Sequence, residues 1–392
     1  MQQRMGIGWR FFRPIVDYIK NTYISMWIVI IACSTYGWLL VYSANYRWGS
    51  EGRAIYMQLL AISIGLIGAV IISLMDYERV GELWWLPAGI CAGLMLLLLT
   101  PLGSGAIGES SVSDNMGWLK FGGLSFQPSE LLKIGFLVTF PYHLSLVIKN
   151  NKLNSMRQLI MLGGHILIPV LLIEIITRDT GSTLMFFIMA MLILISSGVD
   201  WKIITAGFAI VLMSLPILWK FLAVYQQERF RAVYNPKPGD ELDMLYQQVQ
   251  GKMALGGGRL TGQGFLKGTM IQSGLVPESS NDFIFTVAGE EFGFLGTSAI
   301  ILLLVALMIM TVKTALEARD DMGRFICIGF FGLIAAQTIF NLGMVLMVLP
   351  VIGITLPFFS AGGSSSMCIY FGFGLVLSVY SRRKESRMKI LY

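Results

Sequence analysis

Acidic and basic side chains within apolar stretches are the first candidates for chemistry in this chain. Glu130 and Lys133 stand three residues apart, so on a helix they share a face and can form an ion pair. Glu174 lies inside another apolar run, and Asp179 follows at its end. Ionisable groups are costly to place in a membrane, so we expect these residues to serve a function or to pair with other polar groups.

A further acidic pair, Glu290 and Glu291, opens a later apolar run. Together with Lys133 and the other carboxylates, this pair predicts a polar cavity that opens outward and suits an anionic amphiphile at the bilayer surface. Structural interpretations remain open for each group. The Glu130–Lys133 pair can lock helices together, Glu174 can serve as a partner for another helix, and Glu290 and Glu291 can cap or pair locally.

The segment of about 220–283 is long, polar and rich in glycine, and loops of this length are commonly functional. Its candidate residues are Arg229, Arg231, Asp240, Glu241, Asp243, Tyr246, Gln247 and Gln250, followed by the glycine-rich runs 256–259 and 262–264. Glycines permit a close backbone approach to a pyrophosphate, but they are equally typical of tight turns. No Walker loop is present, because the sequence contains no G-x-x-x-x-G-K-[ST] pattern.

The elements that must position these residues are membrane helices. The chain has 392 residues, of which 55% are hydrophobic and 13% are charged, whereas a soluble domain has about 25% charged residues. This composition predicts an all-α polytopic membrane protein forming a single domain over residues 1–392. At about 20 residues per crossing, about ten spans are expected, at roughly 23–43, 55–75, 83–101, 131–148, 158–176, 182–198, 203–219, 284–311, 326–349 and 358–380.

The distribution of Lys and Arg beside these spans predicts the orientation, because basic residues collect on the cytoplasmic side. One side carries Arg4, Arg10, Arg13, Lys20, Arg79, Lys149, Lys152, Arg157, Lys202, Lys313, Arg319, Arg324, Arg382, Arg383, Lys384, Arg387 and Lys389. The short loops of the other side carry only Arg47, Arg53, Lys120 and Arg178. We therefore expect both termini in the cytoplasm and two long loops outside, at about 102–130 and, between spans 7 and 8, at about 220–283. The first span should stay as an anchor, because no signal-peptide cleavage pattern follows it.

Nucleic-acid, disulfide and zinc chemistry are not expected. The net charge of +6 reports topology in a membrane protein, so no nucleic-acid partner is predicted. The cysteines lie in apolar runs without a C-x-x-C pair, and the two histidines are too few for a metal cluster. These residues are Cys33, Cys91, Cys327, Cys368, His143 and His165. Any metal would have to use carboxylates.

Several segments together resemble the SEDS family (shape, elongation, division and sporulation proteins) from the first span to the last. Residues 126–133 read FQPSELLK, 276–285 read VPESSNDFIF and 289–293 read GEEFG. Near the end, 341–344 read NLGM, 349–353 read LPVIG and 356–365 read LPFFSAGGSS. The run GQGFLKGT at 262–269 is more similar to the rod-shape (RodA-type) branch than to the division (FtsW-type) branch.

The resemblance implies a peptidoglycan glycosyltransferase that polymerises lipid II on the outer face of a bacterial plasma membrane, during cell-wall synthesis and shape determination. It also implies a class B penicillin-binding protein as partner. Residues 240–246 read DELDMLY, which matches the register of the essential family aspartate, so Asp240 is the expected catalytic residue and Asp243 is not. The expected substrate-binding residues are Glu130, Lys133, Asp179, Arg229, Arg231, Tyr246, Gln250, Glu278, Asp282 and Ser364.

The expected reaction is an inverting glycosyl transfer. The 4-hydroxyl of one lipid-linked disaccharide attacks the anomeric carbon of another glycan and expels undecaprenyl pyrophosphate. Asp240 would serve as the base, and Lys133 with Arg229 or Arg231 would balance the charge of the leaving group. No cofactor is required by the sequence, although a Mg or Mn ion between Asp240 and the pyrophosphate is compatible with it.

Two other function classes stay open. A lipid II flippase, or another transporter of lipid-linked substrates, also needs polar groups within many spans. Transport by alternating access favours a site at the membrane midplane, whereas the acids here cluster towards the outer side. A non-catalytic scaffold for a penicillin-binding protein is the third interpretation, and the presence of Asp240 and Lys133 favours an enzyme over it.

Overall fold

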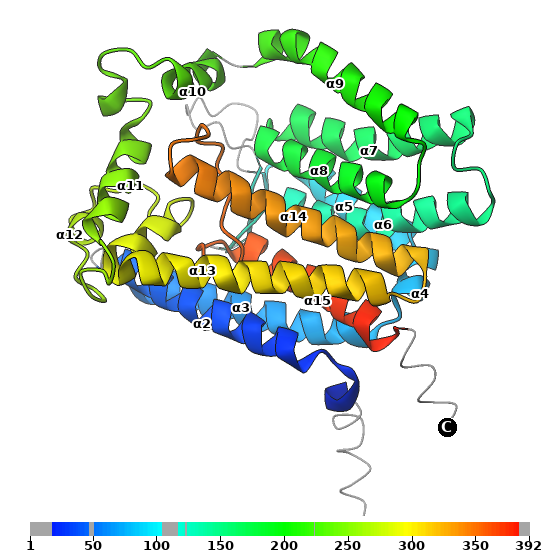
Figure 1. Ribbon diagram of the computed structural model, residues 1–392, viewed down its shortest axis with the longest axis horizontal. Coiled ribbons are helices and arrows are strands. Elements are labelled where there is room, and N and C mark those ends of the chain that lie inside the picture. The colour runs from blue at the N-terminus through cyan, green and yellow to red at the C-terminus, as the bar shows by residue number, and fades with distance from the viewer. Residues whose placement is uncertain (1–17, 47–50, 104–116, 122–123, 223, 384–392) are drawn as a thin grey trace, which may run out of the picture.

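The computed structural model describes residues 18–46, 51–103, 117–121, 124–222 and 224–383. Within these ranges the protein is a bundle of apolar helices with one short two-stranded hairpin (Figure 1). The hairpin pairs β1 (Leu119–Phe121) with β2 (Leu124–Phe126) in antiparallel register. The all-α prediction is therefore confirmed apart from this hairpin, which lies in a segment expected to be a loop.

Seven of the described helices are long and apolar enough to cross a membrane. They are α2 (Ile24–Asn45), α3 (Glu51–Leu74), α6 (Pro128–Lys149), α7 (Met156–Ile176), α13 (Ile284–Glu317), α14 (Asp321–Val345) and α15 (Gly363–Ser381). Three shorter apolar helices follow the remaining predicted spans, namely α5 (Trp85–Leu97), α8 (Thr180–Ser196) and the apolar part of α9 (Trp201–Phe221). Each predicted span thus coincides with a helix, and this protein is a multi-pass membrane protein.

The segment expected to be a long loop, 220–283, is folded into short helices. These are α10 (Val224–Tyr234), the 3-10 turn η2 (Asp240–Leu242), α11 (Tyr246–Gly257) and α12 (Thr269–Gln272). All four lie at the same end of the bundle, which we call the loop end, while α4 (Tyr77–Glu82) lies at the opposite end (Figure 1).

The centre of the bundle is built on α6, α14 and α15, which are its most deeply buried long helices. Close packing there depends on small residues, as is typical of helices inside a membrane. A Cβ atom at Gly65 of α3 would lie 2.3 Å from the ring of Tyr370, and one at Gly372 would lie 2.0 Å from the ring of Phe330. By contrast, α9 lies at the edge of the bundle (Figure 1), and large apolar side chains such as Met213 are exposed there.

The helix α13 is broken near its start, where Gly293 adopts φ 66°. The glycine-rich run 256–264 fills this break and supplies partners for the released backbone groups. Four backbone bonds join the two segments: Phe294 N to Arg259 O (2.9 Å), Leu295 N to Leu260 O (3.2 Å), Gln263 N to Glu290 O (2.9 Å) and Gly264 N to Glu291 O (3.0 Å). Of the two interpretations of these glycines, the geometry therefore supports tight local packing, and their close approach is to another helix.

Replacing Gly258 by Ala is expected to destabilise the protein, because a Cβ atom there would lie 1.8 Å from the carbonyl oxygen of Gly289. Overpacking of this kind costs about 1–3 kcal/mol. Gly256 is the matched control, since nothing lies within 4 Å of its Cβ position and Ala favours a helix by about 0.5–1 kcal/mol. The measurement is the unfolding midpoint in detergent. Equal midpoints for Gly258→Ala and Gly256→Ala would contradict this account of the glycine-rich run.

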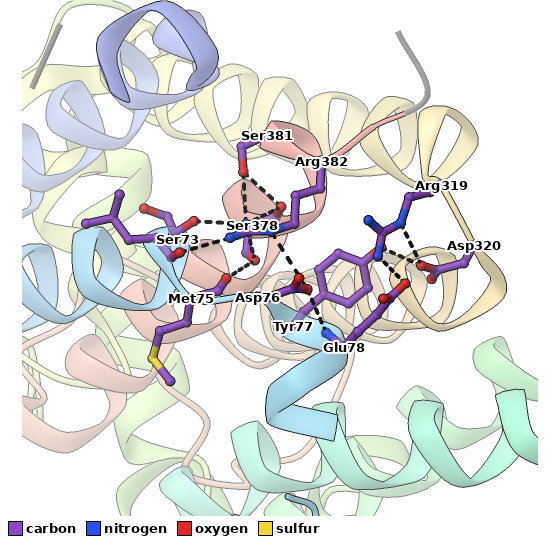
Figure 2. Close-up of polar contacts among 11 residues, drawn as sticks. Ser73, Met75, Asp76, Tyr77, Glu78, Arg319, Asp320, Ser378, Ser381 and Arg382 are labelled. Carbon is purple, nitrogen blue, oxygen red and sulfur yellow. Dashed lines mark hydrogen bonds and ion pairs between the residues drawn. The ribbon is translucent and has the colours of Figure 1, made fainter. Parts of the chain in front are cut away.

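The opposite end of the bundle is held by a polar network that joins the α3–α4 connection, the α13–α14 connection and the end of α15 (Figure 2). Tyr77 donates from its hydroxyl to Asp320 Oδ2 at 2.7 Å, and Arg319 forms an ion pair with Glu78. Beside them, Arg382 Nη2 donates to the carbonyl of Leu74 at 2.9 Å. The residue before α2 also meets the end of α15 here, because the rings of Tyr23 and Tyr380 stack with centroids 4.2 Å apart.

Candidate active site

The predicted pairing of Glu130 and Lys133 is confirmed at the start of α6. Pro128 occupies the first turn, where a missing N–H has no cost, and Glu130 follows it in the same turn. Lys133 Nζ lies 2.7 Å from Glu130 Oε1, and the two side chains are only 3% and 9% exposed. Each charge therefore depends on the other for compensation within the bundle.

The first turn of α6 is connected to the starts of two other helices through Gln127. Its backbone N–H donates to Ser364 Oγ at 2.9 Å, and its side-chain Nε2 donates to Asp179 Oδ2 at 3.3 Å. Asp179 caps α8, accepting from Ser182 N at 2.9 Å and from Ser182 Oγ at 2.7 Å. The structure therefore brings the predicted residues Asp179 and Ser364 together through Gln127, which was not among the predicted site residues.

Three other carboxylates of the apolar runs have structural partners. Glu174 accepts from Thr183 Oγ1 of α8 at 3.1 Å, which fits the interpretation of Glu174 as a partner for another helix. Glu290 accepts from two backbone N–H groups of α12, at 2.8 and 2.9 Å, and so caps that short helix. Glu291 accepts from Ser43 Oγ of α2 at 2.5 Å. Both members of the acidic pair therefore have partners within the protein, although Glu291 Oε2 is buried without a hydrogen-bond partner among the described residues.

Asp240, the expected catalytic residue, is held in η2 by a bidentate ion pair. Arg231 donates from Nη1 to Asp240 Oδ2 at 2.9 Å and from Nη2 to Oδ1 at 3.0 Å. The backbone N–H of Lys237 adds a third bond at 2.6 Å. The Arg231 guanidinium and then the Lys237 N–H lower the pKa of Asp240 to about 2. The carboxylate is therefore charged at every working pH and is a weak proton acceptor, while Asp243 is exposed nearby.

The two predicted arginines of α10 serve different sides of the helix. Arg229 and Arg231 are two residues apart, and residues at this spacing do not share a helix face. Arg231 contacts Asp240, whereas Arg229 Nη1 donates to the carbonyl of Val351 at 3.2 Å. Arg229 thereby contacts the segment that leads from α14 to α15, and its charge also acts on Asp282.

Asp282 lies in the turn before α13, half-buried, within electrostatic reach of three other predicted site residues. Burial is the main cause that raises the pKa of Asp282 to about 6. The charges of Glu278 and Asp179 raise it further, and the charge of Arg229 opposes them. Glu278 itself is exposed and accepts from Asn281 Nδ2 at 2.7 Å.

The remaining predicted residues, Tyr246 and Gln250, are half-buried on α11. The residue that anchors this helix is the buried Gln248, whose Nε2 donates to the carbonyl of Met344 at 2.7 Å and to that of Leu349 at 2.8 Å. Gln248 was missed by sequence reasoning. Its partners are backbone carbonyls about a hundred residues away, which no local pattern identifies.

No group of three or more His, Cys, Asp or Glu side chains within the described ranges is placed to hold a metal ion. His143 and His165 do meet, with their Nδ1 atoms 3.1 Å apart, but His165 Nε2 contacts the hydroxyl of Thr139 at 3.1 Å. All four cysteines are free and buried in apolar surroundings. Both oxygens of Asp240 already accept N–H donors, so the described residues offer no ready-made cation cage there.

The fold and the site define a class of protein: a multi-pass membrane protein with buried and half-buried charges where α6, α8 and α13 begin, joined by Gln127 to Ser364 at the start of α15. A family model described as cell cycle protein, covering the FtsW, RodA and SpoVE proteins, matches residues 23–385. The chain belongs to this family.

Relatives with similar sequences carry names that state an activity. The chain is 31% identical over 350 residues to the peptidoglycan glycosyltransferase MrdB of Escherichia coli strain K12, covering 88% of this chain and 91% of MrdB. It is 34% identical over 298 residues to the probable peptidoglycan glycosyltransferase FtsW of Geobacter sulfurreducens, covering 75% of this chain and 76% of that protein.

Solved structures share the fold. One solved structure comes from work on the structural coordination of polymerization and crosslinking by a peptidoglycan synthase complex. It has a TM-score of 0.74 at 26% identity, and the match covers 93% of this chain and 99% of that chain. The rod shape determining protein RodA of Thermus thermophilus has a TM-score of 0.64 at 23% identity and covers 93% and 98% of the two chains.

Proposed function

We propose that this protein is a peptidoglycan glycosyltransferase that polymerises lipid II into glycan strands at the outer face of a bacterial plasma membrane. The observation that carries this function is the likeness to MrdB, a peptidoglycan glycosyltransferase, over 88% of this chain. The charged residues where α6, α8 and α13 begin also support this function, because a pyrophosphate-linked substrate needs basic groups such as Lys133 and Arg229.

We infer that the chain crosses the membrane ten times, with the loop end outside and both termini in the cytoplasm. The end opposite the loop end carries Arg319 and Arg382, which belong to the basic set expected in the cytoplasm (Figure 2). An even number of crossings also fits the stacking of Tyr23 on Tyr380 at that end. Together with the seven long helices, the shorter α5, α8 and α9 would make ten crossings.

We propose an inverting transfer, in which the 4-hydroxyl of one sugar attacks the anomeric carbon of another and undecaprenyl pyrophosphate departs. Lys133, kept in place by Glu130, and the arginines of α10 would stabilise the charge that develops on the leaving group. The low pKa of Asp240 fits a permanently charged group that positions Arg231. Asp179 and Ser364 would fix the starts of the helices around the substrate.

A class B penicillin-binding protein is the proposed partner. The likeness to a chain in a peptidoglycan synthase complex, at 26% identity and a TM-score of 0.74, supports an assembly of this kind for the present protein. Polymerisation and crosslinking would then be joined in one complex at the outer face.

Liposomes that contain the purified protein and labelled lipid II separate the proposed function from lipid II transport. The protein is expected to produce glycan strands, detected by gel electrophoresis, when its partner transpeptidase is present. Parallel measurement of labelled lipid II at the two leaflets reports flipping. If lipid II changed leaflet while no glycan formed, with or without the partner, the protein would be a transporter and not a polymerase.

A further inference from the structure

The turn before α13 is fixed by its backbone and leaves one side chain without a structural task. Three successive carbonyls of this turn accept hydrogen bonds from α14 and from the segment before α15. These bonds run from Ala361 N to Ser280 O (2.7 Å), from Ser360 Oγ to Asn281 O (2.7 Å) and from Asn341 Nδ2 to Asp282 O (2.8 Å). The position of Asp282 is therefore set without use of its carboxylate.

The Asp282 carboxylate accepts no hydrogen bond from the part of the chain that the structure describes, although its own backbone does. It faces Gly353, where an added Cβ atom would lie 3.7 Å from Asp282 Oδ2. Gly353 adopts φ +74°, a conformation that disfavours any side chain. Gly353, which places no side chain beside the carboxylate, therefore lies next to a group that accepts no hydrogen bond from the described residues.

The charges around Asp282 come from three elements. Glu278 belongs to the same turn, Asp179 caps α8, and Arg229 comes from α10. Asp179 is in turn joined through Gln127 to the first turn of α6, so Asp282 stands beside the cluster that contains the buried ion pair. Asp240 differs from Asp282, because both its carboxylate oxygens already accept hydrogen bonds from Arg231.

A proton acceptor must be free to bond the hydroxyl and must have a pKa near the working pH. Asp240 satisfies neither condition, because its pKa is lowered to about 2 by Arg231. Asp282 satisfies both, because burial and the neighbouring acids raise its pKa to about 6. The geometry and the electrostatics therefore separate the two carboxylates into two tasks.

We propose that Asp282 is the catalytic residue that takes the proton from the attacking sugar hydroxyl, while Asp240 stays charged and positions Arg231. This inference rests on the proposed glycosyltransferase function. As the 4-hydroxyl oxygen bonds to the anomeric carbon, its proton passes to the Asp282 carboxylate. The bond from that carbon to the pyrophosphate oxygen breaks, and its electron pair leaves with undecaprenyl pyrophosphate.

The pH dependence of lipid II polymerisation, measured as kcat/KM with the purified protein and its partner, tests this assignment. A base must be unprotonated to work, so the rate is expected to be level above a pH of about 6 and to fall about tenfold per pH unit below it. If Asp240 took the proton, the rate would stay level down to acidic pH, because the pKa of Asp240 is about 2.

Two variants give an electrostatic readout that a purely structural role of Asp282 would not produce. Glu278→Gln removes a negative neighbour, so the acid limb of the profile should move to lower pH. Arg229→Gln removes a positive neighbour and should move the limb to higher pH, each by roughly half a pH unit or more. Asp243→Asn is the matched control, because Asp243 is exposed and is not among the charges that act on Asp282.

Direct replacement completes the test. Asp282→Asn is expected to lower the rate by about 10²–10⁴-fold, the usual contribution of a general base, and Asp282→Glu should recover part of it. If Asp282→Asn does not fold, the limb shifts of Glu278→Gln and Arg229→Gln decide alone. If the rate does not fall below a pH of about 6, or if both variants move the fall in the same direction, the assignment of Asp282 is wrong. An active wild-type protein would still support the proposed glycosyltransferase function. Inactive wild type would instead reject the function itself.

Discussion

Replacing Asp240 by Asn is expected to lower lipid II polymerisation by about 100-fold or more. The amide cannot accept both N–H groups of Arg231, which now hold Asp240 at 2.9 and 3.0 Å. Arg231 would lose its fixed direction, and a positioned cation is worth far more to a developing phosphate charge than a mobile one. The measurement is the initial rate of glycan formation by the purified protein with its partner transpeptidase.

The matched control is Asp243→Asn, three residues away on the same loop, where the side chain is exposed. This variant should polymerise at the wild-type rate. Asp240→Asn should also keep the acid limb of the pH profile at a pH of about 6, since that limb belongs to Asp282. Wild-type activity in Asp240→Asn together with loss in Asp243→Asn would reverse the assignment. No loss in either variant would remove the loop from the mechanism.

The second large effect is expected at the buried ion pair of α6. Lys133→Met removes the one described partner of Glu130, whose side chain is only 9% exposed. Leaving a buried charge without its partner typically costs about 3–5 kcal/mol. Both the unfolding midpoint in detergent and the polymerisation rate should therefore fall. Lys149→Met, at the exposed last residue of the same helix, should change neither quantity.

A double variant separates stability from chemistry at this pair. Glu130→Gln together with Lys133→Met leaves no uncompensated charge, so most of the lost stability should return. Polymerisation should not return, because the ammonium group proposed to face the pyrophosphate is still missing. Recovery of the rate along with the stability would show that the pair only locks helices, which is the structural interpretation of Glu130 and Lys133.

The sequence was sufficient for those features that depend on local spacing. The i, i+3 placement of Glu130 and Lys133 predicted a pair that the structure confirms at 2.7 Å. The apolar runs predicted helices at all the expected positions, although α5 and α8 are shorter than a full crossing. Local patterns could not predict the folding of 220–283 into α10, η2, α11 and α12, because its composition is typical of a loop.

The parts of the site that escaped prediction depend on contacts between distant segments. Asp240 was assigned as the base because residues 240–246 align with a motif of the family. Such an alignment identifies a position, but it does not predict the ion pair with Arg231 or the lowered pKa of Asp240. Likewise, the environment of Asp282 arises from α8, α10 and its own turn, which lie far apart in the sequence. From the sequence, the glycines of 256–264 were compatible with phosphate binding. In the structure they pack against the break in α13.

The most direct test of the central claim is gel analysis of the products that the purified protein forms from lipid II in the presence of a class B penicillin-binding protein. Polymerisation is predicted to give a ladder of long glycan strands with the wild type and with Asp243→Asn. Asp282→Asn and Asp240→Asn should form glycan at least about 100-fold more slowly. A folded wild-type protein that gives no glycan with any cognate partner would contradict the account.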